Sequence, residues 1–336
     1  MPNIAIINYC NLKCPYCFAD DMIHDKSKAI NLEDFEKILE WVSRTPDNHI
    51  GLIGGEPTLH PEFESILKVV NRYCKNFNTS ATLFTNGIEL DKYLPFIGER
   101  FSILWNLNSP QFMSDEFWKK TNETLEHLDS LSWLDDMPER PSKVCIGCNV
   151  HPGLEDYSFL WEIVDKYKLH RVRTSVVSPG GQYTSMRNDK TAYFAKMKPI
   201  FLEHCKNAAK HQCILNMDCG HIPSCYFTPE EMDIVRAVTD PRHQGDFCEP
   251  VIDITSDFKA TACFGTWDPV DIRDFDNIHE LRRYLMATKN VPRALANTCS
   301  GKCATCKKAE TMKCQGGCLG FADPEKLSKI TDVFFR

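Results

Sequence analysis

The sequence of 336 residues lacks several features that would define a protein class at once. No apolar run approaches the roughly 20 residues that a membrane-spanning helix needs, which argues against a membrane protein. The formal net charge is −7, so a broad basic face for nucleic acid is not indicated. A strand-like run begins at about residue 4, leaving no room for a signal peptide. We also find no internal repeat, linker or low-complexity segment. We therefore expect a cytoplasmic globular protein that binds neither nucleic acid nor membranes.

Cysteine, in contrast, is abundant, with 17 residues. In a cytosolic chain this number indicates metal binding or catalysis and not a disulfide framework. Three of the cysteines, Cys10, Cys14 and Cys17, follow the apolar run Ile4–Ile7 at a spacing that can turn three thiolates toward one point. A [4Fe–4S] cluster has one ligand per iron, so three thiolates leave one iron open for a substrate or cosubstrate. A zinc site would need a fourth ligand, and the nearest downstream candidate, His24, lies outside the common spacings.

Strand-like and helix-like segments alternate six times in the first two-thirds of the chain. The expected strands are 4–7, 49–53, 80–84, 101–107, 143–150 and 171–177, and the expected helices are 32–42, 63–73, 88–97, 115–131, 156–167 and 191–209. Asn31 and Ser114 stand where helix N-caps belong. Six β/α units imply a parallel sheet, but a closed barrel needs eight. We predict an α/β fold, a partial (β/α)6 TIM-like barrel over residues 1–212 with its active site at the carboxyl ends of the strands.

The strand–helix alternation stops after residue 212, and ten of the 17 cysteines follow. We predict a C-terminal cysteine-rich α+β extension over residues 213–336. The runs 251–254 and 259–263 favour a β-hairpin with Cys248 and Cys263 at its base, and a helix fits 277–287. The tail holds Cys299 and the pairs Cys303-x2-Cys306 and Cys314-x3-Cys318. Spacing alone leaves open a zinc ribbon in which the last four of these cysteines close one site.

Two turns and one arginine complete the candidate site. Gly54-Gly55-Glu56-Pro57 ends the second expected strand; the glycines allow close backbone approach and positive φ, and Glu56 offers an acceptor. Thr85-Asn86-Gly87 ends the third expected strand. A turn that lines a ligand and a plain turn with glycine in the left-handed region explain this sequence equally well. Arg173, on the sixth expected strand, has the fork of donors that suits a carboxylate.

The Cys10-x3-Cys14-x2-Cys17 pattern, with Tyr16 before the last cysteine, resembles the signature of radical SAM enzymes. The resemblance implies a [4Fe–4S] cluster on these three cysteines whose open iron binds S-adenosylmethionine (SAM). An electron from a reductant such as flavodoxin or ferredoxin would pass through the cluster and split SAM. The products would be methionine and a 5′-deoxyadenosyl radical that abstracts a hydrogen atom, so the cofactor carries the hard chemistry.

The same resemblance implies where SAM is held. Gly54, Gly55 and Glu56 look like the family's motif for the methionine amino group, and Asn86 lies in a turn similar to one lining the adenosine. Family members often show a Ser-Leu-Asp-Gly type sequence after the fourth strand, where this chain has Asn108 and Ser109 instead. The candidate SAM contacts are Tyr16, Gly54, Gly55, Glu56, Asn86, Asn108, Ser109 and Arg173.

The cysteine-rich third resembles the SPASM or twitch extension of radical SAM enzymes, which holds one or two auxiliary [4Fe–4S] clusters. The resemblance implies that Cys248, Cys263 and Cys318 hold the nearer cluster and that Cys303, Cys306 and Cys314 hold the farther one. The full family pattern has one more cysteine before the hairpin and one after the tail. Here Cys299, Cys219 or Cys225 is left to fill these places, or a cluster keeps an open iron; a single-cluster version is equally open.

Cys219 and Cys225 have a second candidate role, since a thiol near the radical site can donate a hydrogen atom to a substrate radical. The resemblance implies peptide or protein modification: a crosslink, an epimerisation or an oxidation. Because the barrel starts at about residue 4, we see no room for the N-terminal leader-binding domain of many such enzymes. The alternative is therefore a dehydrogenase or epimerase acting on a sugar, amino acid or nucleotide. A third hypothesis, a non-enzymatic electron carrier or zinc-binding interaction protein, predicts no SAM cleavage.

Overall fold

The computed structural model describes residues 1–20, 24–46, 48–135, 142–240, 248, 251–266, 268–298 and 301–334. Contacts divide the chain into two compact units, which are described separately. The first unit comprises Met1–Cys14, Ala19–Gly147 and Val251–Arg283, and the second comprises Pro15–Phe18, Cys148–Pro250 and Tyr284–Arg336. Our division at residue 212 into a barrel and a cysteine-rich extension stays a prediction.

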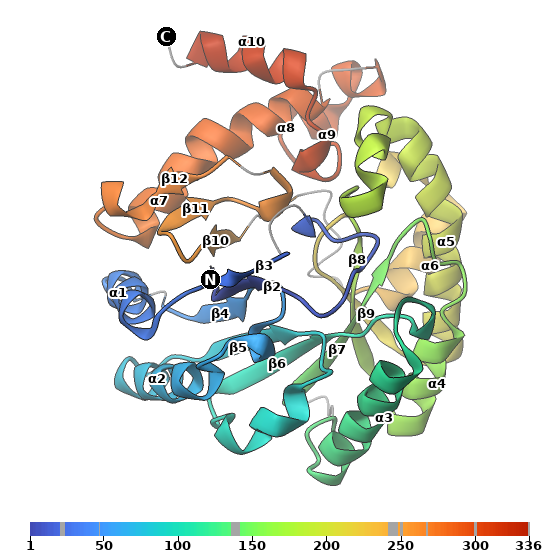
Figure 1. Ribbon diagram of the computed structural model, residues 1–336. Coiled ribbons are helices and arrows are strands. Elements are labelled where there is room, and N and C mark those ends of the chain that lie inside the picture. The colour runs from blue at the N-terminus through green and yellow to red at the C-terminus, as the bar shows by residue number, and fades with distance from the viewer. Residues whose placement is uncertain are drawn as a thin grey trace. The chain divides into compact units, whose positions relative to one another are not determined.

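The first unit is built on a mostly parallel sheet with the strand order β12-β11-β10-β1-β4-β5-β6-β7 (Figure 1). Strands β1, β4, β5, β6 and β7 run parallel, as the alternating pattern predicted. The strand bounds are β1 (Pro2–Ala5), β4 (Ile50–Ile53), β5 (Ala81–Thr85), β6 (Phe101–Asn106), β7 (Val144–Val150), β10 (Ile252–Ile254), β11 (Lys259–Thr261) and β12 (Val270–Asp271). Ile50 and Leu52 of β4 are fully buried, as expected for a central parallel strand.

The predicted hairpin is confirmed, because β10 and β11 pair antiparallel with Asp253 opposite Thr261. It belongs to the first unit, where β10 extends the sheet by pairing parallel with β1. This places Cys263, just after β11, in the first unit, whereas Cys248 belongs to the second.

Four predicted helices of the first unit are confirmed, those at 32–42, 63–73, 115–131 and 277–287, and the one at 88–97 is not. The unit contains α1 (Leu32–Ser43), α2 (Phe63–Asn76), α3 (Asp115–Ser130) and most of α7 (Ile278–Leu285). Asn31 and Ser114 cap α1 and α3, accepting hydrogen bonds from the N–H groups of Asp34 and Phe117. In place of the helix predicted at 88–97 the chain forms the 3-10 helix η3 (Leu90–Phe96), with Pro95 inside it. Proline has no N–H to donate, which disfavours a longer α-helix here. Helices α1 and α2 lie side by side (Figure 1).

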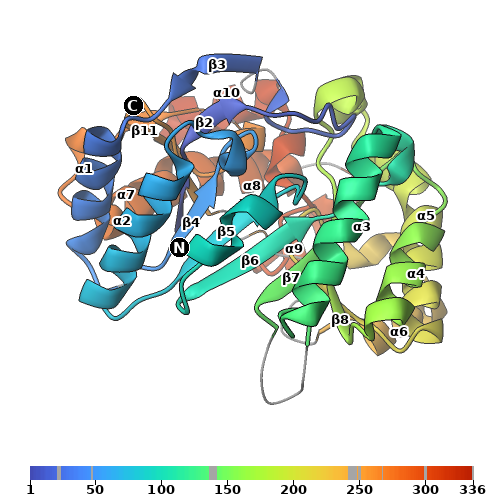
Figure 2. The ribbon, with the colours of Figure 1, turned by 60° about the horizontal axis from the view of Figure 1, so that its bottom comes forward.

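A two-stranded ribbon that the sequence did not predict stands at the carboxyl ends of the parallel strands (Figure 2). It consists of β2 (Ile7–Tyr9) and β3 (His24–Ala29), which pair antiparallel. The ribbon brackets the loop that begins at Cys10. It therefore holds the start of the cysteine loop beside the strand ends, where the parallel architecture puts an active site.

The second unit contains two parallel strands, β8 (Arg171–Val176) and β9 (Ile214–Met217). Its helices are α4 (Ser158–Tyr167), α5 (Lys190–Lys210), α6 (Pro229–Val238), α8 (Val291–Thr298), α9 (Lys307–Glu310) and α10 (Pro324–Phe334), and the π-helix η10 (Met286–Asn290) precedes α8. Strand β9 and helix α6 correct our expectation that the alternation stops at residue 212. The sequence hid them because β9 has only four residues and Ile214 within it is exposed. Among the described residues, no helix combines the length and the apolar character that crossing a membrane requires.

Candidate functional site

The glycine pair after β4 packs directly against the strand that leads into the cysteine loop. The N–H of Gly55 donates to the carbonyl of Ile7 and the N–H of Glu56 to the carbonyl of Tyr9, both at 2.8 Å. A Cβ on Gly54 would lie 2.5 Å from the Ile7 carbonyl oxygen, and one on Gly55 would overlap the Tyr9 carbonyl. Neither glycine has positive φ, so that part of our expectation was wrong. Glycine is needed here because the two backbones approach so closely.

The Glu56 carboxylate is buried and accepts four hydrogen bonds from the first unit. One oxygen accepts from the N–H and hydroxyl of Thr58, at 3.1 and 2.6 Å, and from the hydroxyl of Thr85 at 2.7 Å. The other accepts from the N–H of Asn86 at 2.7 Å. Burial raises the pKa of Glu56, and the hydrogen bonds oppose this by favouring the charged form. The carboxylate therefore fastens the end of β4 to the end of β5.

Asn86 connects this network to the first cysteine. Its side-chain amide donates to the Oδ1 of Asn11 at 2.8 Å and lies 3.8 Å from the Sγ of Cys10. The same sulfur accepts a hydrogen bond from the N–H of Leu12 at 3.4 Å. Gly87, next in the turn, has φ +81°, which confirms the left-handed glycine of the plain-turn interpretation. Asn86 and the glycine turn thus orient Cys10 from the end of β5.

The end of β6 meets the second cysteine. The Cys14 thiol donates to the Oδ1 of Asn108 at 3.3 Å. The hydroxyl of Ser109 accepts from the N–H of Gln111 at 3.3 Å, capping the 3-10 helix η4 (Pro110–Phe112). Five predicted SAM contacts, Gly54, Gly55, Glu56, Asn86 and Asn108, are therefore linked to the cysteine loop within one unit.

The segment Pro15–Phe18, which carries Cys17, belongs to the second unit. The N–H of Gln182 donates to the carbonyl of Pro15 at 3.0 Å. The ring of Tyr16 packs against that of His151, with 4.6 Å between centroids. Burial lowers the pKa of His151 to about 4, so its ring is neutral at pH 7. The aromatic residue of the cysteine motif thus has a neutral aromatic partner, which the sequence did not predict because residue 151 is far along the chain.

Arg173 is held by its own neighbours in the second unit. Its Nε donates to Oδ2 of Asp218 at 2.7 Å, and its Nη1 lies 3.4 Å from Oδ1 of Asn149. The ion pair anchors the start of the loop that begins at Cys219. Its role as a partner of the SAM carboxylate stays a prediction.

Some of the predicted ligand cysteines share a local hydrogen-bond geometry. In four of them the sulfur accepts a hydrogen bond from the N–H two residues later. These pairs are Cys10 with Leu12, Cys263 with Gly265, Cys314 with Gly316 and Cys318 with Gly320, at 3.3 to 3.4 Å. Two cysteines that we did not predict as ligands, Cys145 and Cys213, instead donate their thiols to the next residue's carbonyl. Donors aimed at a sulfur favour the thiolate, which is the form that binds iron.

The cysteines of the second unit form two groups. Cys318 interacts electrostatically with Cys219 and Cys248, and burial raises the pKa of the latter two to about 11 and about 12. The second group consists of Cys225, Cys303 and Cys314, which interact electrostatically with the ammonium of Lys190. No disulfide joins the described cysteines. Cys299 lies outside the described residues, so its predicted role cannot be placed.

A buried asparagine holds the turn between Cys314 and Cys318. The side-chain amide of Asn297 donates to the carbonyls of Gln315, at 2.7 Å, and Cys318, at 3.1 Å. Gly316 and Gly317 have φ of +73° and +93°, the left-handed region that favours glycine. Within the described part of the chain, no three His, Cys, Asp or Glu side chains are close enough to share a single metal ion. In a [4Fe–4S] site each thiolate binds a different iron, and the N–H-to-sulfur pattern fits such a group.

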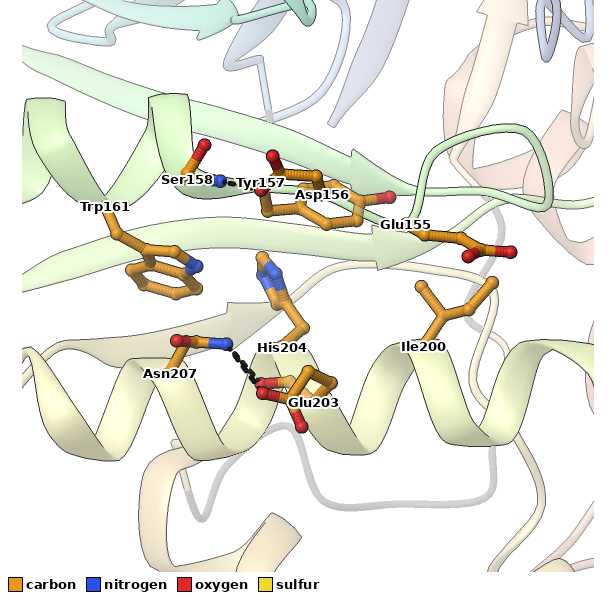
Figure 3. A pocket seen from close by; sticks show the side chains of 9 residues that line it. All are labelled: Glu155, Asp156, Tyr157, Ser158, Trp161, Ile200, Glu203, His204 and Asn207. Carbon is orange, nitrogen blue, oxygen red and sulfur yellow. Dashed lines mark hydrogen bonds between the residues drawn. The ribbon is translucent and has the colours of Figure 1, made fainter.

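A separate hollow of about 350 Å3 lies between α4 and α5, away from every predicted site residue (Figure 3). His204, at its floor, is 1% exposed, and burial lowers its pKa to about 3. The Thr174 hydroxyl donates to the carbonyl of Cys148 and therefore accepts from Nε2 of His204, at 3.2 Å. Among the described residues, His204 Nδ1 and Trp161 Nε1 have no hydrogen-bond partner. The sequence could not reveal this hollow because it forms only when α4 and α5 come together in the fold.

The structure is an α/β protein that brings the start of a cysteine loop and the turns at Glu56 and Asn86 together at the carboxyl ends of its parallel strands. Residues 4–160 match the model of the radical SAM superfamily. This confirms the resemblance seen in the cysteine motif.

Several of the relatives in sequence are named GTP 3′,8-cyclase. The chain is 29% identical over 132 residues to the GTP 3′,8-cyclase of Synechocystis sp., covering 39% of this chain and 38% of the relative. It is 26% identical over 275 residues to a probable GTP 3′,8-cyclase of Thermococcus kodakarensis, covering 77% of this chain and 83% of the relative. Two further curated relatives match over only part of their length, because the chain spans 24% of one and 30% of the other.

The solved structures with a similar fold carry different names from those of the sequence relatives. Streptococcus suis SuiB bound to S-adenosylmethionine has a TM-score of 0.62 and 16% identity, covering 94% of this chain and 72% of that one. Native anSMEcpe with bound AdoMet and the Kp18Cys peptide has a TM-score of 0.61 and 16% identity, covering 100% and 96%. These likenesses concern the fold and confirm the predicted α/β class with a TIM-like partial barrel.

Proposed function

We propose that this protein is a radical SAM enzyme that cleaves SAM reductively and modifies a peptide, with one or two auxiliary [4Fe–4S] clusters. The proposal keeps residues 1–212 as the catalytic barrel and 213–336 as the auxiliary-cluster extension. SAM bound at the N-terminal cluster would supply the hydrogen-abstracting radical. A flavodoxin or ferredoxin would supply the electron.

The observation that carries the proposal is the hydrogen-bond pattern at the sulfurs. Cys10, Cys263, Cys314 and Cys318 come from three distant parts of the chain, yet each accepts the N–H two residues later. Such bonds hold a sulfur in place and favour its ionised form. A cysteine-rich extension that repeats the geometry of the N-terminal motif supports clusters at both sites.

The chain's own residues would then have separate tasks. Cys10, Cys14 and Cys17 would hold the N-terminal cluster, and Asn86 and Asn108 would orient the first two thiols. Because four donors occupy the Glu56 carboxylate, we assign Glu56 to fixing the strand ends and the backbone around Gly54 and Gly55 to meeting the SAM amino group. Tyr16, Ser109 and Arg173 complete the proposed SAM contacts. Cys219 stays our candidate hydrogen-atom donor, since its loop is anchored by the Arg173–Asp218 pair.

The peptide substrate is supported by the fold likeness to anSMEcpe with its bound peptide, which extends over 96% of that chain. A second candidate is a nucleotide substrate. It is favoured by the sequence match to the Thermococcus kodakarensis probable GTP 3′,8-cyclase, which extends over 83% of that relative. A matched pair of incubations separates the two: the reduced enzyme and SAM with GTP, or with peptides from neighbouring short reading frames. The substrate is the compound whose addition raises 5′-deoxyadenosine formation and which is converted to a product that differs in mass or in chromatographic retention.

The cofactor part is tested by counting iron, sulfide and zinc per chain after anaerobic reconstitution. Wild type is compared with the variant in which Cys10, Cys14 and Cys17 are all alanine. We expect the variant to lose about four irons and to retain about four or eight. Zinc without iron in the wild type would overturn the proposal.

A further inference from the structure

Cys225 lies in the 3-10 helix η6 (Ser224–Tyr226), which contacts the cysteine-rich tail on one side and helix α5 on the other. On one side, the Ser224 hydroxyl accepts a 3.0 Å hydrogen bond from the ammonium of Lys308, two residues after Cys306. On the other side, the ring of Tyr226 packs on that of Phe194, 5.0 Å between centroids. The neighbours of Cys225 on both sides are therefore fixed to other parts of the second unit.

Phe194 also lies against the glycine turn of the tail. Its ring also packs on Phe321, 5.3 Å between centroids, in the 3-10 helix η12 (Leu319–Phe321). A Cβ on Gly317 would lie 2.7 Å from the Phe194 ring and 3.4 Å from the carbonyl oxygen of His221. The loop that bears Cys225 and the turn between Cys314 and Cys318 thus share one packed core.

The Lys190 ammonium interacts with both the loop that bears Cys225 and the turn between Cys314 and Cys318. It donates to the carbonyl and Oδ1 of Asn297, at 2.7 and 3.0 Å, and a Cβ on Gly316 would lie 3.3 Å from it. It interacts electrostatically with Cys225, Cys303 and Cys314, which come from separate stretches of chain. Tyr226 likewise interacts with both Cys225 and Cys303.

The tail triplet Cys303, Cys306 and Cys314 would leave one iron of a [4Fe–4S] cluster without a protein ligand. Cys318 belongs to the other group, with Cys219 and Cys248. Four thiolates and a cluster would bring negative charge into this region, and Lys190 supplies the opposite charge.

We propose that Cys225 is the fourth protein ligand of the auxiliary cluster held by Cys303, Cys306 and Cys314. On binding, its thiol loses a proton and its thiolate takes the remaining iron. This assignment rests on the proposed auxiliary clusters and replaces the hydrogen-donor role that we considered for Cys225. The tail cluster then has no open iron, so it transfers electrons and does not bind substrate.

The first test uses the wild-type chain and thiol alkylation. Cys225 is exposed, so iodoacetamide should modify it readily once a chelator and an oxidant have removed any clusters. In the reconstituted holoprotein, we expect its modification, measured by peptide mass spectrometry, to slow at least about tenfold because the thiolate is bound. Equal rates in the two forms would overturn the assignment.

The second test counts iron in a chain whose Cys10, Cys14 and Cys17 are alanine, so that only auxiliary clusters remain. Adding Cys225→Ala or Cys225→Ser should lower iron by about one to four atoms per chain and, on partial loss, yield the EPR signal of a three-iron cluster. Cys205→Ala, which removes a buried thiol of α5 outside both groups, should leave the iron unchanged. Iron in the parent that neither Cys225 substitution alters would overturn only the ligand assignment. A parent without iron would overturn the auxiliary clusters as well.

Discussion

The backbone N–H of Asn86 donates a 2.7 Å hydrogen bond to the carboxylate of Glu56, and this bond joins the end of β5 to the end of β4. Glu56 is only 1% exposed, so the bond forms away from water. The side chain of Asn86 lies beside the sulfur of Cys10. The buried carboxylate therefore supports the position of Cys10, the first proposed cluster ligand, through a single intermediate residue.

Replacing Glu56 with glutamine should destabilise the first unit. An amide has one acceptor oxygen in place of two, so at least one buried donor loses its partner, at a cost of about 1–3 kcal/mol. Urea unfolding of the metal-free protein measures the change. Glu64→Gln is the control, because Glu64 makes only an exposed ion pair with Lys68 and should cost under about 1 kcal/mol. Equal effects of the two substitutions would contradict this role.

Gly55→Ala should displace the cysteine loop. The new Cβ would overlap the carbonyl of Tyr9, which is backbone and cannot swing aside. We expect a loss of about 1–3 kcal/mol in the free energy of unfolding and weaker retention of the N-terminal cluster. Gly265→Ala is the control, since its Cβ would meet only the Cys263 sulfur, at 3.5 Å. An alanine at residue 55 that leaves both stability and iron unchanged would refute the close-approach explanation.

His204 should make the protein sensitive to acid. Its folded-state pKa, about 3, lies below the value of about 6.5 in an unfolded chain, so the unfolded state takes up the proton first. Stability is full above pH 6.5 and falls as pH drops below it, by about 2 kcal/mol at pH 5. His204→Gln should remove this part of the pH dependence, measured by urea unfolding at pH 7 and pH 5. The control is His127→Gln, on an exposed pair with Asp91. An unchanged pH profile in His204→Gln would show that His204 is not the titrating group.

Lys190→Met should lower the reduction potential of the tail cluster. Removing a positive charge beside thiolates disfavours the added electron, and a tenfold shift in the one-electron equilibrium corresponds to about 59 mV. A redox titration followed by EPR, in the chain lacking the N-terminal cysteines, measures the shift. Lys198→Met removes a lysine of the same helix that pairs with Glu231 instead and should leave the potential unchanged. Identical potentials in the two variants would exclude an electrostatic role for Lys190.

Local sequence patterns predicted the strands, helix caps and turns that depend on residues close together in the chain. Hydrophobic period, capping chemistry and turn residues predicted the parallel strands β1, β4, β5, β6 and β7, the caps Asn31 and Ser114 and the β10–β11 hairpin. The prediction failed where a short or interrupted segment depends on tertiary packing. Strand β9 is short and half-exposed, and Pro95 converts the expected helix into a 3-10 helix.

For the site, motif spacing identified Cys10, Cys14 and the turns at Glu56 and Asn86, which the fold brings together. It could not reveal partners that meet only through folding. His151 packs on Tyr16 from a strand more than a hundred residues away, and Asn297 holds the Cys314–Cys318 turn from another helix. No local signal marks either residue.

The central claim is that the chain performs radical SAM chemistry, and the most direct measurement is 5′-deoxyadenosine formed per enzyme. Anaerobically reconstituted protein is mixed with SAM and dithionite, and the products are quantified by liquid chromatography coupled to mass spectrometry. The account predicts 5′-deoxyadenosine and methionine in equal amounts from the wild type. It predicts none above background from Cys14→Ala, with Cys74→Ala, a buried thiol in α2, behaving as wild type. A reconstituted, iron-loaded wild type that leaves SAM intact under reduction would contradict the account.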